Sequence, residues 1–127
     1  MNPIVLQSDN LPHPKLSYSQ AVRIGNLLFV AGQPGIEFSS GIVSDDFEAQ
    51  ARQAFQNLAT VLQAGGSSFQ RVIKTTIWLR DATNFETLNK LYTEYFPVDP
   101  PARSTPVVGL PKPNLQISIE AIAVVGE

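Results

Sequence analysis

The alternation of apolar and polar residues predicts a β-hairpin close to the N-terminus. Residues 1–15 contain three prolines among polar residues, so we expect irregular or edge-like chain there. Residues 19–31 then form two short apolar runs on either side of Gly25 and Asn26. A two-residue Gly-Asn connection between such runs is typical of a hairpin turn.

A helix is predicted after the glycine-, serine- and proline-rich stretch that follows the hairpin. Asp45 stands three residues before Glu48, as in a capping box, and Gly65 and Gly66 end the apolar pattern. Between them, apolar residues recur at helical spacing at Phe47, Ala51, Ala54, Phe55, Leu58, Val61 and Leu62.

A second helix is predicted to begin at Thr83, which stands three residues before Glu86, and to end before Pro97. Its apolar stripe consists of Phe85, Leu88, Leu91, Tyr92 and Tyr95. We interpret this stripe as packing rather than as a stacking platform for a ligand.

Three further strands are expected around the second helix. Residues 72–80 alternate, residues 103–109 form a short strand bounded by Pro106, and residues 115–125 form the most apolar strand. The predicted faces of the first of these are Ile73, Thr75, Ile77 and Leu79 on one side, and Lys74, Thr76, Trp78 and Arg80 on the other. We expect Trp78 to serve in core or interface packing.

This order of elements predicts one α+β or α/β domain over residues 1–127, with both helices on one face of a sheet. Two helices cannot cover both faces, yet the last strand is apolar on both sides. Ile117, Ile119, Ala121 and Ala123 make one side, and Ile122 and Val124 belong to the other. We therefore expect other subunits to cover the second face.

Glu120 is the one charged residue of that last strand, and it shares the second face with Gln116 and Ser118. An ionised carboxylate buried there requires a cation or hydrogen-bond donors. Arg103 is the best candidate partner, because it begins the preceding strand and has no other charged residue beside it. A simple hairpin centred on residues 110–113 would set it almost opposite Glu120, but nothing in the sequence fixes that register. Two interpretations stay open: a structural ion pair, or a site in which Arg103 binds a ligand carboxylate and Glu120 handles water or a proton.

Composition excludes several classes of function. The chain has no cysteine and a single histidine, His13, which lies between two prolines and is expected in a surface loop. A thiolate nucleophile, a disulfide framework and a soft metal site are thus excluded. The net charge of -2 does not favour nucleic acid, and no apolar run reaches the length of a membrane span. We expect a cytoplasmic protein.

Five separated motifs resemble, in order and spacing, the RidA family, also called YjgF, over nearly the whole chain. The motifs are SYSQA at 17–21, VAGQ at 30–33, NFETLNKLYTEYF at 84–96, PARST at 101–105 and ISIEAIA at 117–123. The resemblance implies a chorismate-mutase-like α+β fold with a mixed sheet, assembled as a homotrimer with ligand clefts between subunits. It also implies hydrolysis of reactive 2-imino acids, formed from enamines such as 2-aminoacrylate, to 2-keto acids and ammonia without metal or organic cofactor.

The same resemblance implies roles for individual residues. Arg103 matches the arginine that grips the substrate carboxylate, and Glu120 matches the glutamate that positions or activates water. Tyr18 matches the tyrosine that lines the cleft, where its hydroxyl is placed to polarise or reprotonate the substrate. The remaining substrate-binding positions are Asn89 at the same interface, Ala31, and the backbone near Gly32 and Thr105.

The chain departs from the family pattern at three places. Leu16 and Ser17 replace a Gly-Pro pair, Ala31 replaces a serine, and Thr105, followed by Pro106, replaces a frequent cysteine. Arg103 and Glu120 are kept, so these changes bear on substrate preference more than on reaction type.

Two other classes of function remain as alternatives. One is a non-enzymatic ligand-binding, chaperone-like or regulatory trimer. The other is a ribonuclease or translation inhibitor, against which the acidic balance and the lack of a basic run or of a Ser/His or His/His pair argue.

Overall fold

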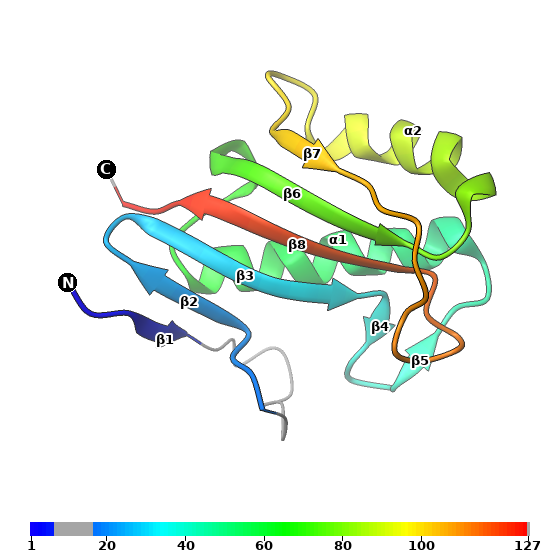
Figure 1. Ribbon diagram of the computed structural model, residues 1–127, viewed down its shortest axis with the longest axis horizontal. Coiled ribbons are helices and arrows are strands. Elements are labelled where there is room, and N and C mark those ends of the chain that lie inside the picture. The colour runs from blue at the N-terminus through cyan, green and yellow to red at the C-terminus, as the bar shows by residue number, and fades with distance from the viewer. Residues whose placement is uncertain (7–16, 127) are drawn as a thin grey trace.

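The computed structural model describes residues 1–6 and 17–126, and its centre is a mixed six-stranded sheet in the order β1-β2-β3-β8-β6-β7 (Figure 1). Neighbouring strands are antiparallel except β6 and β7, which are parallel. The strands of the sheet are β1 (Ile4–Leu6), β2 (Ala21–Ile24), β3 (Leu27–Pro34), β6 (Val72–Leu79), β7 (Ala102–Ser104) and β8 (Ile117–Val124).

Two helices, two short 3₁₀ turns and a small second sheet complete the fold. The helices are α1 (Phe47–Ala64) and α2 (Phe85–Tyr95), and the turns are η1 (Phe69–Arg71) and η2 (Ala82–Asn84). The second sheet pairs β4 (Ile36–Glu37) with β5 (Ile42–Val43). Among the described residues, no helix combines the length and the apolar character that crossing a bilayer requires.

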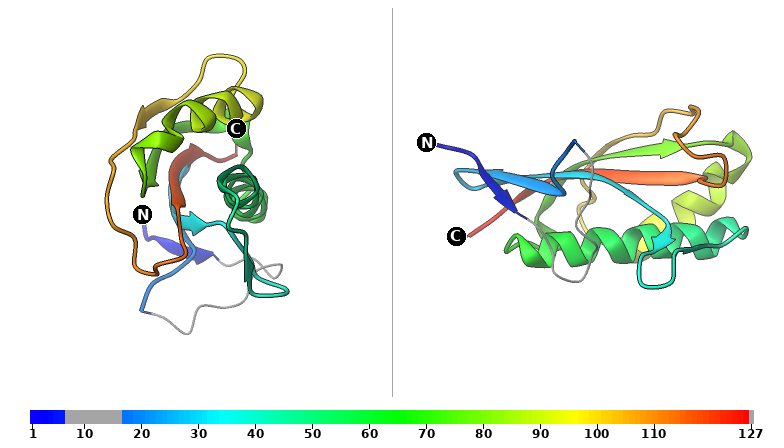
Figure 2. Two further views of the ribbon diagram at one scale, coloured as in Figure 1. Left: turned by 90° about the vertical axis from the view of Figure 1, so that its right-hand side faces the viewer. Right: turned by 90° about the horizontal axis from the view of Figure 1, so that it is seen from below.

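Both helices pack on the same face of the six-stranded sheet, as predicted (Figure 2). The core between the helices and the sheet includes Phe55, Leu58, Ile77 and Ile119, which are fully buried. The other face of the sheet carries no helix. Its side chains include Val5, Val22, Leu27, Phe29, Ile122 and Val124, and none of them is buried within the chain.

The predicted hairpin is confirmed as β2 and β3, with Gly25 and Asn26 between the strands. Gly25 has a φ of 58°, a left-handed conformation that glycine adopts without the steric cost of a Cβ. β1 adds to the outer side of β2 and is the edge of the sheet.

Both helices are confirmed, but their caps differ from the prediction. The N-cap of α1 is Asp46 rather than Asp45, and the Asp46 carboxylate accepts a 2.9 Å hydrogen bond from the Ala49 N–H. Before α2, the carboxylate of Asp81 accepts from the N–H of Thr83 and caps η2, so Thr83 is not the cap of the helix. The N–H and the hydroxyl of Thr83 both donate to the Asp81 carboxylate and hold the pKa of Asp81 below its usual value.

A β-bulge interrupts the predicted alternation of β6. Val72 pairs with Ala123 and Lys74 with Ile122, which leaves Ile73 as an extra residue. Ile73 is therefore 48% exposed instead of sharing the buried face with Thr75 and the residues beyond it.

The last two strands do not form the simple hairpin that would set Arg103 opposite Glu120. β7 runs parallel to the outer side of β6, where Arg103 pairs with Thr75, and β8 lies on the inner side of β6. The path continues beyond β7, because the Leu79 N–H donates to the Pro106 carbonyl and the Val108 N–H donates to the Leu79 carbonyl. Residues 105–116 therefore connect strands that are not neighbours, and Pro106 lies at the edge, where its missing N–H costs no ladder bond.

Candidate functional site

Glu120 lies opposite a β-bulge in the neighbouring strand β3. Val30 pairs with Ala121 and Gln33 with Ile119, so two residues of β3, Ala31 and Gly32, face the single residue Glu120. The Gln33 amide donates a 3.1 Å hydrogen bond to the Ala31 carbonyl and so supports the bulge. Bulges of this kind re-aim side chains and often lie beside active sites.

Gly32 allows β3 and β8 to approach closely next to Glu120. A Cβ added at Gly32 would lie 2.6 Å from the hydroxyl oxygen of Ser118. Any side chain at this position would therefore force Ser118 or the strand to move. The family resemblance implied that the backbone near Gly32 binds substrate. The close approach of Ser118 is a physical reason for a glycine at this position.

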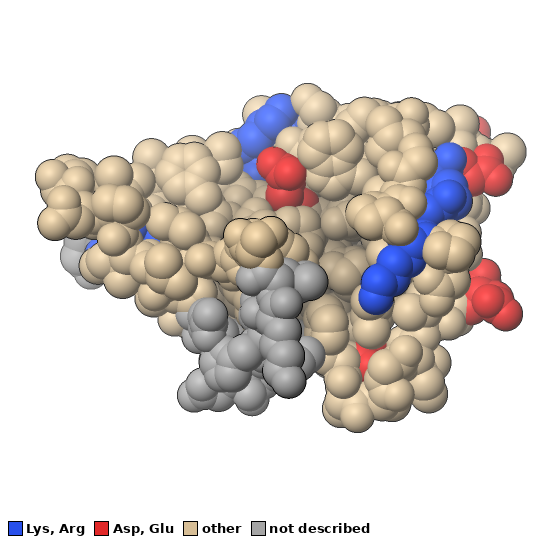
Figure 3. All heavy atoms as spheres, turned by 60° about the horizontal axis from the view of Figure 1, so that its bottom comes forward, with Lys and Arg blue, Asp and Glu red and all other residues tan. Residues whose placement is uncertain are grey.

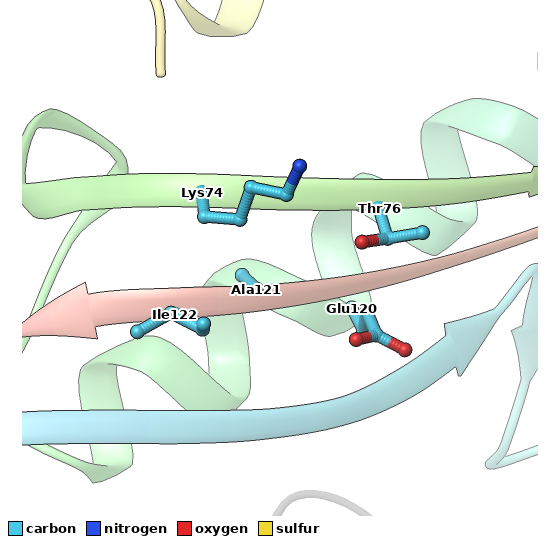
Figure 4. A pocket seen from close by; sticks show the side chains of 5 residues that line it. All are labelled: Lys74, Thr76, Glu120, Ala121 and Ile122. Atoms are coloured by element: carbon cyan, nitrogen blue, oxygen red, sulfur yellow. The ribbon is translucent and has the colours of Figure 1, made fainter. Parts of the chain in front are cut away.

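The carboxylate of Glu120 lies on the helix-free face and lines a shallow hollow of about 100 Å³ with Lys74, Thr76, Ala121 and Ile122 (Figure 4). The Trp78 indole N–H donates to the Oε1 atom of Glu120 over 3.2 Å. Lys74 directs its ammonium to the Ser104 hydroxyl at 2.9 Å. Within the described chain, Arg52 makes the ion pairs, with Glu48 and Glu94, so Glu120 has no cationic partner among these residues.

Arg103 lies on the edge strand β7, against α2. Its Nη2 atom donates a 2.7 Å hydrogen bond to the Asn89 amide oxygen. Its guanidinium carbon lies 4.7 Å from the ring centre of Tyr92 and 5.6 Å from that of Phe85. Asn89 uses one of the five N–H donors, so a guanidinium held in this way can still bind a planar carboxylate.

Tyr92 connects the Arg103 environment to the core. Its hydroxyl lies 2.7 Å from the Thr75 hydroxyl, and its side chain is 5% exposed. Burial raises the pKa of Tyr92, while the hydrogen bond to Thr75 and the positive charge of Arg103 oppose that rise. The neutral ring therefore forms a fixed surface over which Arg103 lies.

Arg103 and Glu120 lie on opposite faces of the sheet. Ala121, Thr75 and Arg103 form one cross-strand row, on the helix-covered face. Glu120, Thr76 and Ser104 form the next row, whose side chains point to the helix-free face. The expected pairing of Arg103 with Glu120 is therefore not made within one chain.

The candidate residues thus form two clusters in one subunit. The carboxylate cluster consists of Ala31, Gly32, Trp78 and Glu120. The guanidinium cluster consists of Phe85, Asn89, Tyr92 and Arg103.

Figure 3 views the surface obliquely from the front and below, and Lys, Arg, Asp and Glu side chains occupy only small parts of it.

Neither Tyr18 nor Thr105 makes a hydrogen bond to Glu120 or Arg103 within the described chain. The Ala31 N–H donates to the Gln20 carbonyl at 2.9 Å, which holds the residues before β2 next to the bulge. Tyr18, two residues earlier, is 55% exposed. Thr105 follows β7 and is half-buried.

Sequence patterns assigned three residues of these clusters to packing. Trp78, Phe85 and Tyr92 were expected in core or interface contacts, whereas each of them contacts Glu120 or Arg103. A signal was present for Trp78, which shares a strand face with Lys74 and carries an N–H that needs a partner when partly buried. No local pattern indicated that Arg103 would pack against α2.

The described residues, 1–6 and 17–126, contain no group of three His, Asp or Glu side chains arranged to hold a metal ion. His13 and Leu16 lie outside these residues.

Comparison with known proteins gives consistent matches along the chain. A family model described as endoribonuclease L-PSP matches residues 8–125. A RutC family protein of Pyrococcus horikoshii is 45% identical over 121 residues, covering 94% of this chain and 95% of that protein. The 2-iminobutanoate/2-iminopropanoate deaminase of Homo sapiens is 41% identical over 111 residues, covering 86% of this chain and 80% of that protein.

Among solved structures, the YjgF gene product of E. coli superposes with a TM-score of 0.89 at 35% identity, covering 95% of this chain and 98% of that one. Sequence and fold therefore agree along almost the whole chain, and this protein belongs to the RidA/YjgF family, to which the endoribonuclease L-PSP model corresponds.

Proposed function

We propose that this protein hydrolyses small reactive 2-imino acids to 2-keto acids and ammonia, in clefts between the subunits of a homotrimer. The observation that carries the proposal is that Arg103 and Glu120 lie on opposite faces of one subunit, each without an ion-pair partner in the described chain. The names of relatives, including a human 2-iminobutanoate/2-iminopropanoate deaminase, support an imine deaminase role.

A complete site forms when the guanidinium cluster of one subunit meets the carboxylate cluster of the next. The helix-free face carries Glu120 among apolar side chains, such as Phe29, which is 43% exposed. A three-fold arrangement places the β7 and α2 edge of each subunit on the helix-free face of its neighbour and closes a ring. Apolar surface is then removed from water, and Arg103 comes within reach of Glu120.

In this site Arg103 binds the substrate carboxylate with two parallel hydrogen bonds. Asn89 and the two aromatic rings fix the orientation of the guanidinium, and the backbone amides near Gly32 and Thr105 contribute further donors. The substrate is held with its imine carbon facing Glu120, which converts a reaction between free molecules into one between oriented groups.

Glu120 then positions a water about 3 Å from the imine carbon and accepts its proton as the carbon–oxygen bond forms. The C=N double bond becomes single, and the nitrogen carries the displaced electron pair. Return of this proton from Glu120 to the nitrogen gives a carbinolamine, which carries a hydroxyl and an amino group on the same carbon. Glu120 then accepts the hydroxyl proton and passes it to the amino group, with Tyr18 placed to assist, so that the C=O bond forms as the C–N bond breaks. The products are a 2-keto acid and ammonia, and the steps require neither a metal ion nor an organic cofactor.

The direct test is a coupled assay in which a pyridoxal-phosphate-dependent dehydratase produces 2-aminoacrylate from serine. We expect the protein to accelerate pyruvate formation, and we expect Arg103→Ala to abolish the acceleration while remaining trimeric. A well-folded trimeric wild type without any acceleration would refute the deaminase proposal. Binding of 2-keto acids by such an inactive protein would instead support the ligand-binding alternative.

A further inference from the structure

Within the described residues, the indole of Trp78 is the hydrogen-bond partner of the Glu120 carboxylate. Trp78 lies on β6 opposite Ser118, and Glu120 lies on β8 opposite Thr76, so the two side chains are diagonal neighbours on the helix-free face. Diagonal neighbours of this kind come within reach when one of them is a large aromatic residue. The resulting hydrogen bond runs from Nε1 of Trp78 to Oε1 of Glu120 over 3.2 Å.

The chemistry of an indole limits what this contact can do. The Nε1–H group only donates, so Oε1 of Glu120 must accept. Because the indole carries no charge and exchanges no proton in catalysis, it can orient the carboxylate without competing for the proton of the water. A lysine or arginine in the same place would add a charge next to Glu120.

We propose that Trp78 is a positioning residue that holds Oε1 of Glu120 and thereby turns Oε2 toward the water that attacks the imine. Within the described chain, Trp78 is the one group hydrogen-bonded to this carboxylate, so Oε2 is available for the water. Both residues stand on central strands of the sheet, which restricts their motion. This inference rests on the proposed deaminase function and adds to it a residue that acts through Glu120.

The alternative is that Trp78 only fills space, which is what its sequence pattern predicts. The two roles separate in Trp78→Phe, which keeps most of the aromatic surface and removes the N–H donor. Packing depends on the surface, whereas orientation of Glu120 depends on the donor.

The kinetic test measures kcat and KM for wild type, Trp78→Phe, Glu120→Gln and the double variant in the coupled assay. We expect Trp78→Phe to lower kcat about tenfold and to leave KM within about twofold, because one hydrogen bond to a charged group is lost. In the Glu120→Gln background the same change should cost less than about twofold, since coupled residues are not additive. Ile73→Val, at the exposed bulge of the same strand, is the control for general disturbance of β6.

A spectroscopic test does not depend on activity. Trp78 is the only tryptophan of the chain, so indole fluorescence reports on this side chain alone. Glu120→Gln replaces the charged acceptor by an amide, and we expect it to shift the emission maximum of the native trimer. Glu94→Gln makes the same chemical change on α2, at a residue paired with Arg52, and should leave the emission unchanged.

Each result has a defined meaning. An unchanged kcat in Trp78→Phe, an equal loss in the Glu120→Gln background, or an emission that does not respond to Glu120→Gln would overturn the positioning role. An inactive wild type would refute the deaminase function and the catalytic part of this inference. The fluorescence comparison would still decide whether the indole donates to Glu120.

Discussion

The guanidinium of Arg103 is held by an amide and two aromatic rings instead of a carboxylate. Asn89 accepts one hydrogen bond at 2.7 Å, and Tyr92 and Phe85 lie within cation–π distance. A neutral environment fixes the position of the group and leaves its charge uncompensated. Such a group suits the binding of a small carboxylate, so the neighbours that fix its position should affect substrate binding.

Asn89→Ala should weaken substrate binding more than turnover. The guanidinium loses the acceptor that fixes its orientation, and we expect KM to rise about tenfold while kcat changes much less. Lys90→Ala, at the next position of α2, serves as the control and should behave as wild type. An unchanged KM in Asn89→Ala would show that the aromatic rings alone orient Arg103.

Tyr92 should make the stability of the protein sensitive to alkaline pH. Burial raises the pKa of Tyr92 in the folded state, whereas in the unfolded chain the phenol ionises at about 10. Above that pH the unfolded chain loses the proton first, so the free energy of unfolding falls until the pH passes the folded pKa. We expect the stability difference between wild type and Tyr92→Phe to be smaller at pH 11 than at pH 8, by denaturant unfolding at one protein concentration. A constant difference would contradict the assignment of this effect to Tyr92.

At the scale of elements, Arg80 fixes the long connection between the two strands that carry Arg103 and Glu120. Its guanidinium donates to the carbonyls of Leu115 at 2.6 Å, Lys112 at 2.7 Å and Leu110 at 3.1 Å. These bonds attach residues 110–115 to the end of β6. The connection can therefore pass from the outer edge of the sheet to its centre along a defined path.

Arg80→Met should destabilise the fold while keeping much of the side-chain volume. Three carbonyls lose their donor, and we expect the free energy of unfolding to fall by about 1–3 kcal/mol. Arg23→Met removes a single bond to the Gly25 carbonyl at an exposed turn and should change it by less than about 0.5 kcal/mol. Equal effects of the two variants in denaturant unfolding would show that the Arg80 contacts do not fix the connection.

Helices and turns that are determined by residues close together in the sequence could be predicted. The pairing of strands that are far apart in the sequence could not. The hairpin turn at Gly25 and the extent of α1 follow from local spacing, although the choice between Asp45 and Asp46 as cap depends on one hydrogen bond. The bulges at Ile73 and at Ala31 and Gly32 leave no local signal. The parallel placement of β7 beside β6 also leaves no local signal, because residues 105–116 are long enough to form either a hairpin or a crossover connection. The sequence named the candidate residues, but it did not show that the structure divides them between two faces of the sheet.

At the scale of the whole molecule, one subunit presents two incomplete clusters and one uncovered face. The carboxylate cluster lies on the helix-free face, and the guanidinium cluster lies against α2 at the β7 edge. A single chain cannot bring them together without breaking the register of β6 with its neighbours. We therefore propose that Arg103 and Glu120 of one site come from different subunits.

The most direct test is to mix two strongly impaired variants, Arg103→Ala and Glu120→Gln, by unfolding and refolding them together in equal amounts, after the residual activity of each has been measured. Every trimer that contains both variants then has one site with both residues intact, which predicts recovery of about a quarter of the wild-type activity. Native mass spectrometry of differently tagged chains confirms that mixed trimers have formed. Mixed trimers with no more activity than the separate variants would contradict the account, because Arg103 and Glu120 would then have to act from the same subunit.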